Sequence, residues 1–203
     1  HNPETGEIYI PKEICNVQLT HEDKELLRKG IRLFCQRFDA TWGGFGLAPK
    51  FPAPHNLLFL MRYAELEQEP EALAMAETTL QAMDRGGIHD QFGGGFSRYS
   101  TDEKWLAPHF EKMLYDNALL LMAYGKAYQL TGKESYANTA RRTADYILRE
   151  LTDKSGGFFC GQDADSDGVE GKYYLFTPEE VCEVLGKEDG EEICRRYGIT
   201  ACG

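Results

Sequence analysis

The side chains best suited to chemistry stand together in one stretch of the sequence. His109, Glu111 and Asp116 supply a titratable base and two carboxyl groups, and Arg98, slightly earlier, supplies a fixed positive charge. Groups of these types perform general acid–base catalysis when they are held within hydrogen-bonding reach of a substrate. This stretch is therefore the first candidate for a catalytic site.

Further along the chain, Asp163 and Asp165 supply two more carboxyl groups. Glycoside hydrolysis needs two opposed carboxyl groups, one acting as an acid and the other as a base or nucleophile. Asp163 or Asp165 opposite Asp116 would form such a pair. Epimerisation of a sugar instead needs bases on both faces of a carbon next to a carbonyl. His109 and His89 could serve there, although His89, next to an aspartate, is equally well explained as a hydrogen-bonding loop residue.

Aromatic residues near these groups could hold a sugar ring. Trp42, Trp105, Tyr99 and Tyr115 offer flat apolar faces, and Lys50, which lies between two prolines, could pair with one of the acids. The candidate catalytic residues are His109, Asp116, Asp163, Asp165 and Glu111. The candidate substrate-binding residues are Arg98, Tyr99, Trp105, Trp42, Lys50, Tyr115 and His89.

The same charges also have structural explanations. A network of ion pairs and caps at a helix end would contain the same residue types, because such networks also perturb charged groups. Asp163, Asp165, Asp167 and Gly168 match positions 1, 3, 5 and 6 of a calcium loop, but Tyr174 stands where that loop needs a bidentate glutamate. A solvated acidic turn explains these residues as well, so we expect neither a metal ion nor a cofactor.

The placement of the candidate residues depends on a helix that we expect to begin at Pro108 and to run to about residue 130. Proline suits the first helical position, where its missing N–H costs nothing. In such a helix His109, Lys112 and Asp116 lie on one face. The next segment, 118–124, is apolar all round, which predicts a helix that is buried on every side.

Six further helices are predicted from apolar residues at helical spacing, from capping residues and prolines at their starts, and from glycines after their ends. We expect four at residues 20–40, 70–85, 134–151 and 191–197, and two that open near Pro54 and at Thr177. A short strand is expected at 173–176. Loops rich in glycine and proline separate these elements.

The sequence Gly-Gly-Phe occurs three times, at 43–45, 94–96 and 156–158. About two helices lie between successive copies, and repetition of this kind indicates stacked helical hairpins. Such hairpins place their long loops on one rim, where the glycine loops and the polar start of the 108–130 helix would meet. An ordinary helical bundle with decorated loops is the alternative.

Composition restricts the kinds of partner. The 203 residues are 42% hydrophobic and 12% aromatic, and the formal net charge is −11. A nucleic-acid-binding protein needs a basic face, so we expect neither nucleic acid nor an anionic membrane as a partner. No apolar run is long enough to span a bilayer, and the opening residues do not resemble a signal peptide.

Six cysteines stand at 15, 35, 160, 182, 194 and 202, and none forms a Cys-x-x-Cys pair. The sequence therefore shows neither a zinc ribbon nor a thioredoxin-like redox motif. Three of these cysteines fall in predicted helices as small apolar groups, and we expect a reducing, cytoplasmic environment. Residues 1–19 are predicted to form a linker and 20–203 one domain. The absence of an initial Met suggests a piece of a longer protein.

Several strings of sequence are long and specific enough to indicate a family. They are Asp39 with 43–46, 48–52, Asp90-Gln91 with 93–96, 98–100, Asp102, Trp105, 108–117 and 163–166. Over about residues 20–186 they resemble the thioredoxin-domain-containing family of spermatogenesis-associated thioredoxin-like proteins and their bacterial relatives.

This resemblance implies an N-terminal thioredoxin-like domain followed by an (α/α)6 toroid, similar to N-acylglucosamine 2-epimerase and six-hairpin glycosidases. The thioredoxin-like domain is absent from this sequence, so redox chemistry is not carried over. Seven helices are also too few to close the toroid. We therefore expect an all-α fold, an incomplete α/α toroid corresponding to its first half, with long glycine-rich loops on one rim. The thioredoxin-like domain is an expected partner in a longer protein, and exposed helix faces favour self-association.

Two functions fit these features. The first is a carbohydrate-active or carbohydrate-binding domain, epimerase- or glycosidase-like, with a sugar-like small molecule as its ligand. The alternative is a non-catalytic structural or interaction module that partners a thioredoxin-like domain. A pocket of ligand size among His109, Asp116, Asp163 and Arg98 would favour the first, and complete mutual pairing of these groups would favour the second.

Overall fold

The computed structural model describes residues 20–201. The predicted linker at 1–19 and the last cysteine, at 202, lie outside these residues. The described residues divide into two units, 20–37 and 38–201. A single domain over 20–203 stays a prediction.

The described part of the first unit is helix α2 (His21–Arg37). Thr20 caps this helix, which was expected at residues 20–40: its hydroxyl accepts the Asp23 N–H at 3.1 Å, and the Asp23 carboxylate accepts the Thr20 N–H at 2.8 Å. These two bonds satisfy backbone donors that a helix start leaves unpaired. None of the side chains of α2 is buried, and Leu26 and Leu33 are exposed.

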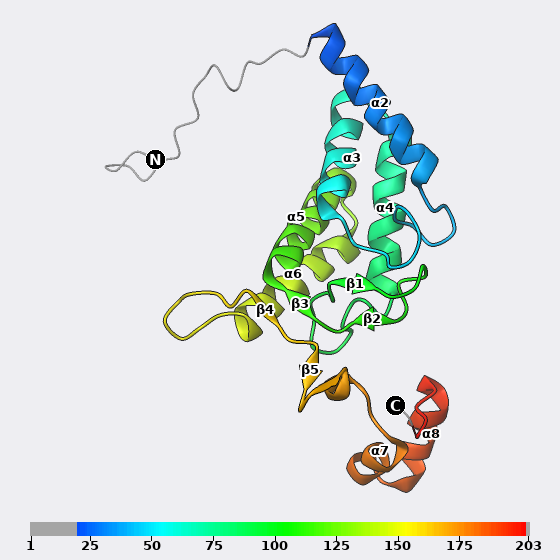
Figure 1. Cartoon of the computed structure of the whole chain (residues 1–203), viewed down its shortest axis with the longest axis vertical. Coiled ribbons are helices and arrows are strands. Elements are labelled where there is room, and N and C mark those ends of the chain that lie inside the picture. The colour runs from blue at the N-terminus through cyan, green and yellow to red at the C-terminus, as the bar shows by residue number, and fades with distance from the viewer. Residues whose placement is uncertain (1–19, 202–203) are drawn as a thin grey trace. The chain divides into compact units, whose positions relative to one another are not determined.

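The core of the second unit consists of two helical hairpins. The first joins α3 (Pro54–Glu67) to α4 (Pro70–Arg85), and the second joins α5 (Leu114–Thr131) to α6 (Glu134–Glu150). Within each hairpin the two helices pack on each other, and α3 also packs on α5 (Figure 1). The fully buried apolar side chains include Leu57, Leu60, Met61, Leu80, Leu120 and Tyr124.

Local sequence explains where these helices begin and end. Pro54 and Pro70 each occupy one of the first two positions of their helix, as predicted. Gly132 ends α5 in the left-handed conformation, with φ 69°, and donates its N–H to Tyr128 O at 2.8 Å. A glycine adopts that conformation without the steric penalty of a Cβ atom.

The prediction of a helix that begins at Pro108 is wrong. Pro108–His109 form strand β2, which pairs antiparallel with β1 (Tyr99–Ser100). Lys112–Met113 form β3, paired with β4 (Gly161–Gln162), and α5 begins only at Leu114. Pairing with segments distant in sequence overrides the local helix signal. His109 and Asp116 therefore do not share a helical face.

Helix α5 is also not buried on every side, contrary to the prediction. Its buried residues include Asn117, Leu120 and Tyr124, whereas Met122 is 58% exposed and Tyr128 lies at the surface. Its described neighbours, α3 and α6, cover part of its surface only. A helix that is apolar all round is normally buried on every side, so the uncovered face of α5 is unusual.

The last part of the chain contains a hairpin and two helices. Strands β5 (Asp165–Ser166) and β6 (Val169–Glu170) pair with each other, and residues Lys172–Tyr174 form a 3-10 helix where a strand was predicted. That prediction fails because Gly171, with φ 74°, turns the chain directly before it.

Helices α7 (Pro178–Leu185) and α8 (Lys187–Tyr197) pack on each other. Helix α7 opens at Thr177 as predicted, with a capping box in which the side chains of Thr177 and Glu180 each accept the other's backbone N–H. No helix over residues 20–201 is long and apolar enough to cross a membrane.

Candidate functional site

The three Gly-Gly-Phe sequences fold into closely similar loops. In each, the N–H of an aspartate donates to the carbonyl of the second glycine, and the residue before the aspartate pairs with the phenylalanine. The N–H donations are Asp39 to Gly44 at 3.0 Å, Asp90 to Gly95 at 3.0 Å and Asp153 to Gly157 at 2.8 Å. The pairings are Phe38 with Phe45, His89 with Phe96 and Thr152 with Phe158. The sequence repeat is therefore a structural repeat.

A buried lysine holds each of the first two loops. Lys112, 2% exposed, donates to Asp90 Oδ2 at 2.8 Å and to Gly94 O at 2.9 Å. Burial is the largest influence on Asp90 and opposes its charged form, but the hydrogen bond and charge of Lys112 and two backbone hydrogen bonds together lower the pKa of the Asp90 carboxyl. Burial also lowers the pKa of the Lys112 ammonium. This ammonium lies over the rings of Tyr146 and Tyr174.

Lys50 plays the same part in the first loop. Its ammonium donates to Asp39 Oδ2 at 2.7 Å and to the carbonyls of Gly43 and Glu103 at 2.8 Å each. All three of its N–H groups are thus used, and the residue is almost completely buried. Lys50 pairs with Asp39 and does not reach a surface where a substrate could bind.

Two more of the predicted substrate-binding residues are in the interior. Trp105 is 0% exposed and donates its indole N–H to Trp42 O at 2.9 Å. His89 is buried, its ring stacks on Phe96, and its Nδ1 lies 3.1 Å from Asp84 O. Trp105 therefore offers no free face to a sugar, and His89 is not available as the second base. Trp42 keeps an exposed ring, which Lys104 approaches.

Short strand pairings bring the three loops side by side, as predicted for a common rim. Lys50 and Ser100 exchange backbone hydrogen bonds of 2.8 and 2.9 Å, which joins the first loop to the second. Lys112 pairs with Gln162, which joins the second loop to the third. Each lysine thus anchors one loop through its side chain and the next through its backbone.

The remaining candidates gather where β1 meets β2. Arg98 donates to Glu111 twice, from its backbone N–H to the carbonyl and from Nη1 to Oε2, both at 2.8 Å. The hydrogen bond to Glu111, followed by the charge of the nearby Tyr115, raises the pKa of the Arg98 guanidinium. His109 Nδ1 lies 2.5 Å from Glu170 Oε1, and its Nε2 lies 4.0 Å from Glu111 Oε2. Arg98, His109, Glu111, Asp116 and Glu170 are called the acid–base cluster below.

Asp116 differs from the other carboxylates of the described chain. Burial raises the pKa of its carboxyl to about 6, although the charge of Arg98 lowers it and that of Glu111 raises it further. Its Oδ2 atom is buried and accepts no hydrogen bond from any described residue. Asp116 lies in the first turn of α5, where a helix favours negative charge, yet burial prevails. The carboxyl can therefore gain or lose a proton close to neutral pH.

Sequence reasoning missed three residues of this region. Glu170 reaches His109 from β6, and an Asp-Gly turn at 167–168 is a hairpin signal that predicts such an arrangement. Phe51 packs its ring on Tyr99 with centroids 4.9 Å apart. Asn117, fully buried, ties α5 to the second loop by accepting Phe96 N–H at 2.7 Å and donating to Phe96 O at 3.0 Å.

Asp163 and Asp165 are exposed and do not form a calcium loop. Asp163 Oδ1 accepts the Asp165 N–H at 3.1 Å, and Asp165 pairs with Glu170 in the β5–β6 hairpin. Asp167, with φ 53°, and Gly168, with φ 76°, form the hairpin turn. Over the described residues, no group of three or more His, Cys, Asp or Glu side chains is placed to hold a metal ion.

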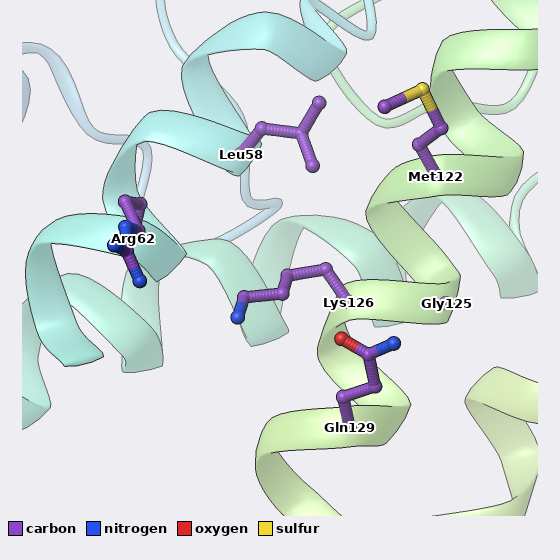
Figure 2. Close-up of a pocket in the computed structure, with 6 residues that line it drawn as sticks. All are labelled: Leu58, Arg62, Met122, Gly125, Lys126 and Gln129. Carbon is purple, nitrogen blue, oxygen red and sulfur yellow. The ribbon is translucent and has the colours of Figure 1, made fainter. Parts of the chain in front are cut away.

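A cavity of about 590 Å³ lies elsewhere, between α3 and α5 (Figure 2). Its lining residues are Leu58, Arg62, Met122, Gly125, Lys126 and Gln129. Arg62 and Lys126 both bind Glu65, at 2.6 and 3.0 Å, so their charges are already compensated. None of the predicted site residues lines this cavity, and it holds no acid or base for catalysis.

Comparison with known proteins confirms the resemblance found in the sequence. No protein-family model matches the chain. The human protein named Spermatogenesis-associated protein 20 is 44% identical over 185 residues, which cover 82% of this chain and 24% of that protein. The chain thus spans about a quarter of the length of this relative.

A second relative has an enzyme name. Cellobiose 2-epimerase of Bacteroides fragilis is 35% identical over 89 residues, covering 43% of this chain and 23% of that protein. This similarity is confined to less than half of the chain, so it does not by itself assign the reaction.

Solved structures show the fold. Cellobiose 2-epimerase from Bacillus thermoamylovorans matches with a TM-score of 0.62 at 11% identity, over 88% of this chain and 54% of that chain. An α-mannanase of family GH76 from Bacteroides thetaiotaomicron matches with a TM-score of 0.59 at 18% identity, over 73% of this chain and 44% of that chain. The fold is that of an incomplete α/α toroid, since the match covers about half of each of these neighbouring chains.

Proposed function

We propose that this chain is a sugar-binding α/α-toroid segment whose acid–base cluster transfers protons to or from a carbohydrate. The observation that carries the proposal is the state of Asp116, which has a pKa of about 6 and a buried oxygen without a described hydrogen-bond donor. A carboxyl group that titrates near neutral pH is matched to general acid–base catalysis. The carbohydrate names of the partial relative and of the toroid neighbours support a sugar as the substrate.

Each member of the cluster has a role in this proposal. Asp116 is the general acid or base, because burial brings the pKa of its carboxyl to about 6. Glu111 is the second carboxylate, and Arg98, bound to it at 2.8 Å, holds its side chain in place. His109 is held in one orientation by Glu170 and exchanges a proton through Nε2.

Which reaction the cluster would catalyse depends on which two of these groups face the sugar. Two carboxyl groups, Asp116 and Glu111, on opposite sides of a glycosidic bond would give hydrolysis. Asp116 with His109 on opposite faces of a carbon next to a carbonyl would give epimerisation. Asp163 and Asp165 remain outside both schemes, as Asp165 pairs with Glu170 in the hairpin and Asp163 accepts the Asp165 N–H.

A direct test is a titration of the isotope-labelled chain with cellobiose, glucose and N-acetylglucosamine, observed by NMR. The proposal expects the His109 ring signals and the backbone amides of 98–99 and 111–116 to shift in a saturable way. The Asp116→Asn variant should bind at least about tenfold more weakly, because one charged hydrogen bond contributes about 1.5–3 kcal/mol. Sugars that leave all of these signals unchanged would contradict the proposal.

A structural module is the second candidate, and one observation favours it. Arg98 is already bound to Glu111 and His109 to Glu170, so only Asp116 in the cluster lacks a described partner. In that case the cluster serves to fasten β1, β2 and the hairpin together. Asp116→Asn would then lower the melting temperature without affecting the binding of any sugar, whereas a binding role predicts the reverse.

A further inference from the structure

We infer that the acid–base cluster receives an uncharged pyranose, stacked against Phe51 and Tyr99, and rejects sugar phosphates and uronic acids. The inference rests on the proposed function and adds the chemical class of its substrate. Two independent observations lead to it: a fixed aromatic stack beside the cluster, and the sign and pairing of the charges within it.

The aromatic stack consists of Phe51, Tyr99 and His109. Tyr99 stands directly opposite His109 in the β1–β2 pair, and their rings stack with centroids 4.9 Å apart. Phe51 packs on Tyr99 in a tilted arrangement, also with centroids 4.9 Å apart, and is 50% exposed. An exposed aromatic face next to polar groups suits a ring that has one apolar face and hydroxyl groups at its edge.

The position of this stack is fixed before any ligand binds. Phe51 follows Lys50, whose side chain is buried against Asp39 and whose backbone is bonded to Ser100. Ser100 in turn follows Tyr99. The buried ion pair and the strand bridge therefore hold the Phe51 and Tyr99 rings at one spacing, and a preorganised surface loses little entropy on binding.

Among the described residues of the cluster beside the aromatic stack, no positive charge is left unpaired to bind an anion. Glu111, Asp116 and Glu170 supply three carboxyl groups, and Asp165 pairs with Glu170 in the hairpin. Arg98 is the permanent cation of the cluster, and Glu111 already binds it at 2.8 Å. His109 is likewise bound to Glu170. A phosphate or carboxylate on the sugar would meet uncompensated negative charge, which repels it across several ångströms.

The nearby lysines do not change this balance. The ammonium groups of Lys50 and Lys112 are buried in bonds to Asp39 and Asp90. Lys172, in the hairpin region, is bound to Asp167 at 2.7 Å. The whole chain has a formal net charge of −11, so its long-range field also disfavours anions.

The test compares three ligands of the same ring: methyl β-D-glucopyranoside, methyl β-D-glucuronide and glucose 6-phosphate. Each is titrated into the labelled chain near neutral pH at low salt, and the amide signals of 99 and 109 are followed. The uncharged glycoside should bind at least tenfold more tightly than either anion. Added salt should narrow this difference, because it screens the repulsion.

Two matched pairs of variants test the parts of the inference separately. Phe51→Ala should weaken glycoside binding at least fivefold, whereas Phe158→Ala, at a 55% exposed phenylalanine of the third loop, should leave it unchanged. Glu170→Gln should reduce the penalty on the glucuronide, whereas Glu183→Gln, on exposed α7, should not. Equal effects within either pair would overturn that part of the inference.

The outcomes also distinguish this inference from the proposed function. If the glucuronide or the phosphate binds as tightly as the uncharged glycoside, the substrate class is wrong, but the cluster still binds sugars. If no ligand shifts the signals of 99 and 109, the proposed function itself fails.

Discussion

The ammonium of Lys112 donates to the carboxylate of Asp90 at 2.8 Å, and the same arrangement recurs between Lys50 and Asp39 at 2.7 Å. In both cases the lysine also bonds the carbonyl of the first glycine of the loop, Gly94 or Gly43. A buried charge is tolerated only when a partner and hydrogen bonds compensate it. The two glycine loops are therefore held from inside by buried ion pairs.

Removal of Lys112 should destabilise the chain strongly. Lys112→Met leaves the Asp90 carboxylate half-buried without its cation, and breaking a buried pair in this way costs about 3–5 kcal/mol. Lys50→Met should have a cost of the same order, since its environment is similar. Urea unfolding followed by circular dichroism measures both, with the exposed Lys154→Met in the third loop as a control that should lie close to wild type.

The double variant Lys112→Met/Asp90→Asn provides a check on the cause. If an unpaired charge accounts for the loss, neutralising Asp90 should restore part of the stability. A double variant that is less stable than Lys112→Met alone would show that the packing of the lysine matters more than its charge.

The raised pKa of Asp116 should increase the free energy of unfolding in mild acid. Its folded pKa, about 6, is above the ordinary value of 3.8, so the folded state binds this proton more tightly than the unfolded state. The contribution is complete below about pH 4 and is lost as the pH rises through about 6. Asp116→Asn should remove this pH dependence and leave the stability at pH 7 equal or higher.

The melting temperatures of wild type and Asp116→Asn are measured between pH 4 and 7. The difference between the two melting temperatures at each pH gives the contribution of Asp116 to stability. Taking the difference is necessary because Asp39, Asp84 and Asp90 have lowered pKa values and act in the opposite direction. Parallel curves for the two proteins would contradict the raised pKa of Asp116.

Asn117 should be as important to the fold as a core residue. It is fully buried, accepts a hydrogen bond from Phe96 and donates two, to Phe96 O and to Met113 O. Asn117→Leu leaves backbone groups unsatisfied, at about 1–3 kcal/mol for each. Hydrogen exchange should show faster opening of the Phe96 amide, whereas the substitution Asn138→Leu on the exposed face of α6 should have no such effect.

Two glycine substitutions separate backbone strain from steric clash. A Cβ atom on Gly95 would lie 2.4 Å from the Tyr146 ring, whereas one on Gly156 of the third loop meets nothing within 4 Å. Both glycines have positive φ, 77° and 91°, so each alanine variant bears the left-handed strain of roughly 1–2 kcal/mol. Gly95→Ala should therefore be clearly the less stable in urea unfolding. Equal losses would mean that the Tyr146 ring can move aside.

Much of the helical framework was evident in the sequence. Pro54, Pro70 and the Thr177 capping box mark helix starts through local chemistry, and local chemistry does not depend on the rest of the fold. The Gly-Gly-Phe repeat likewise predicted similar loops along one rim. The cluster was also partly predictable, because Arg98, His109, Glu111 and Asp116 are close in sequence and the strand pairing keeps them close in space.

The rest was decided by contacts between distant segments. Pro108–Met113 has the residue types of a helix start, but pairing with 99–100 and 161–162 makes it two short strands. Whether Lys50 points to solvent or to Asp39, and whether Trp105 is exposed or sealed over Gly44, depends on loops that meet only after folding. The local sequence determines backbone preferences. It does not determine burial, because burial depends on which distant segments of the chain pack against a residue.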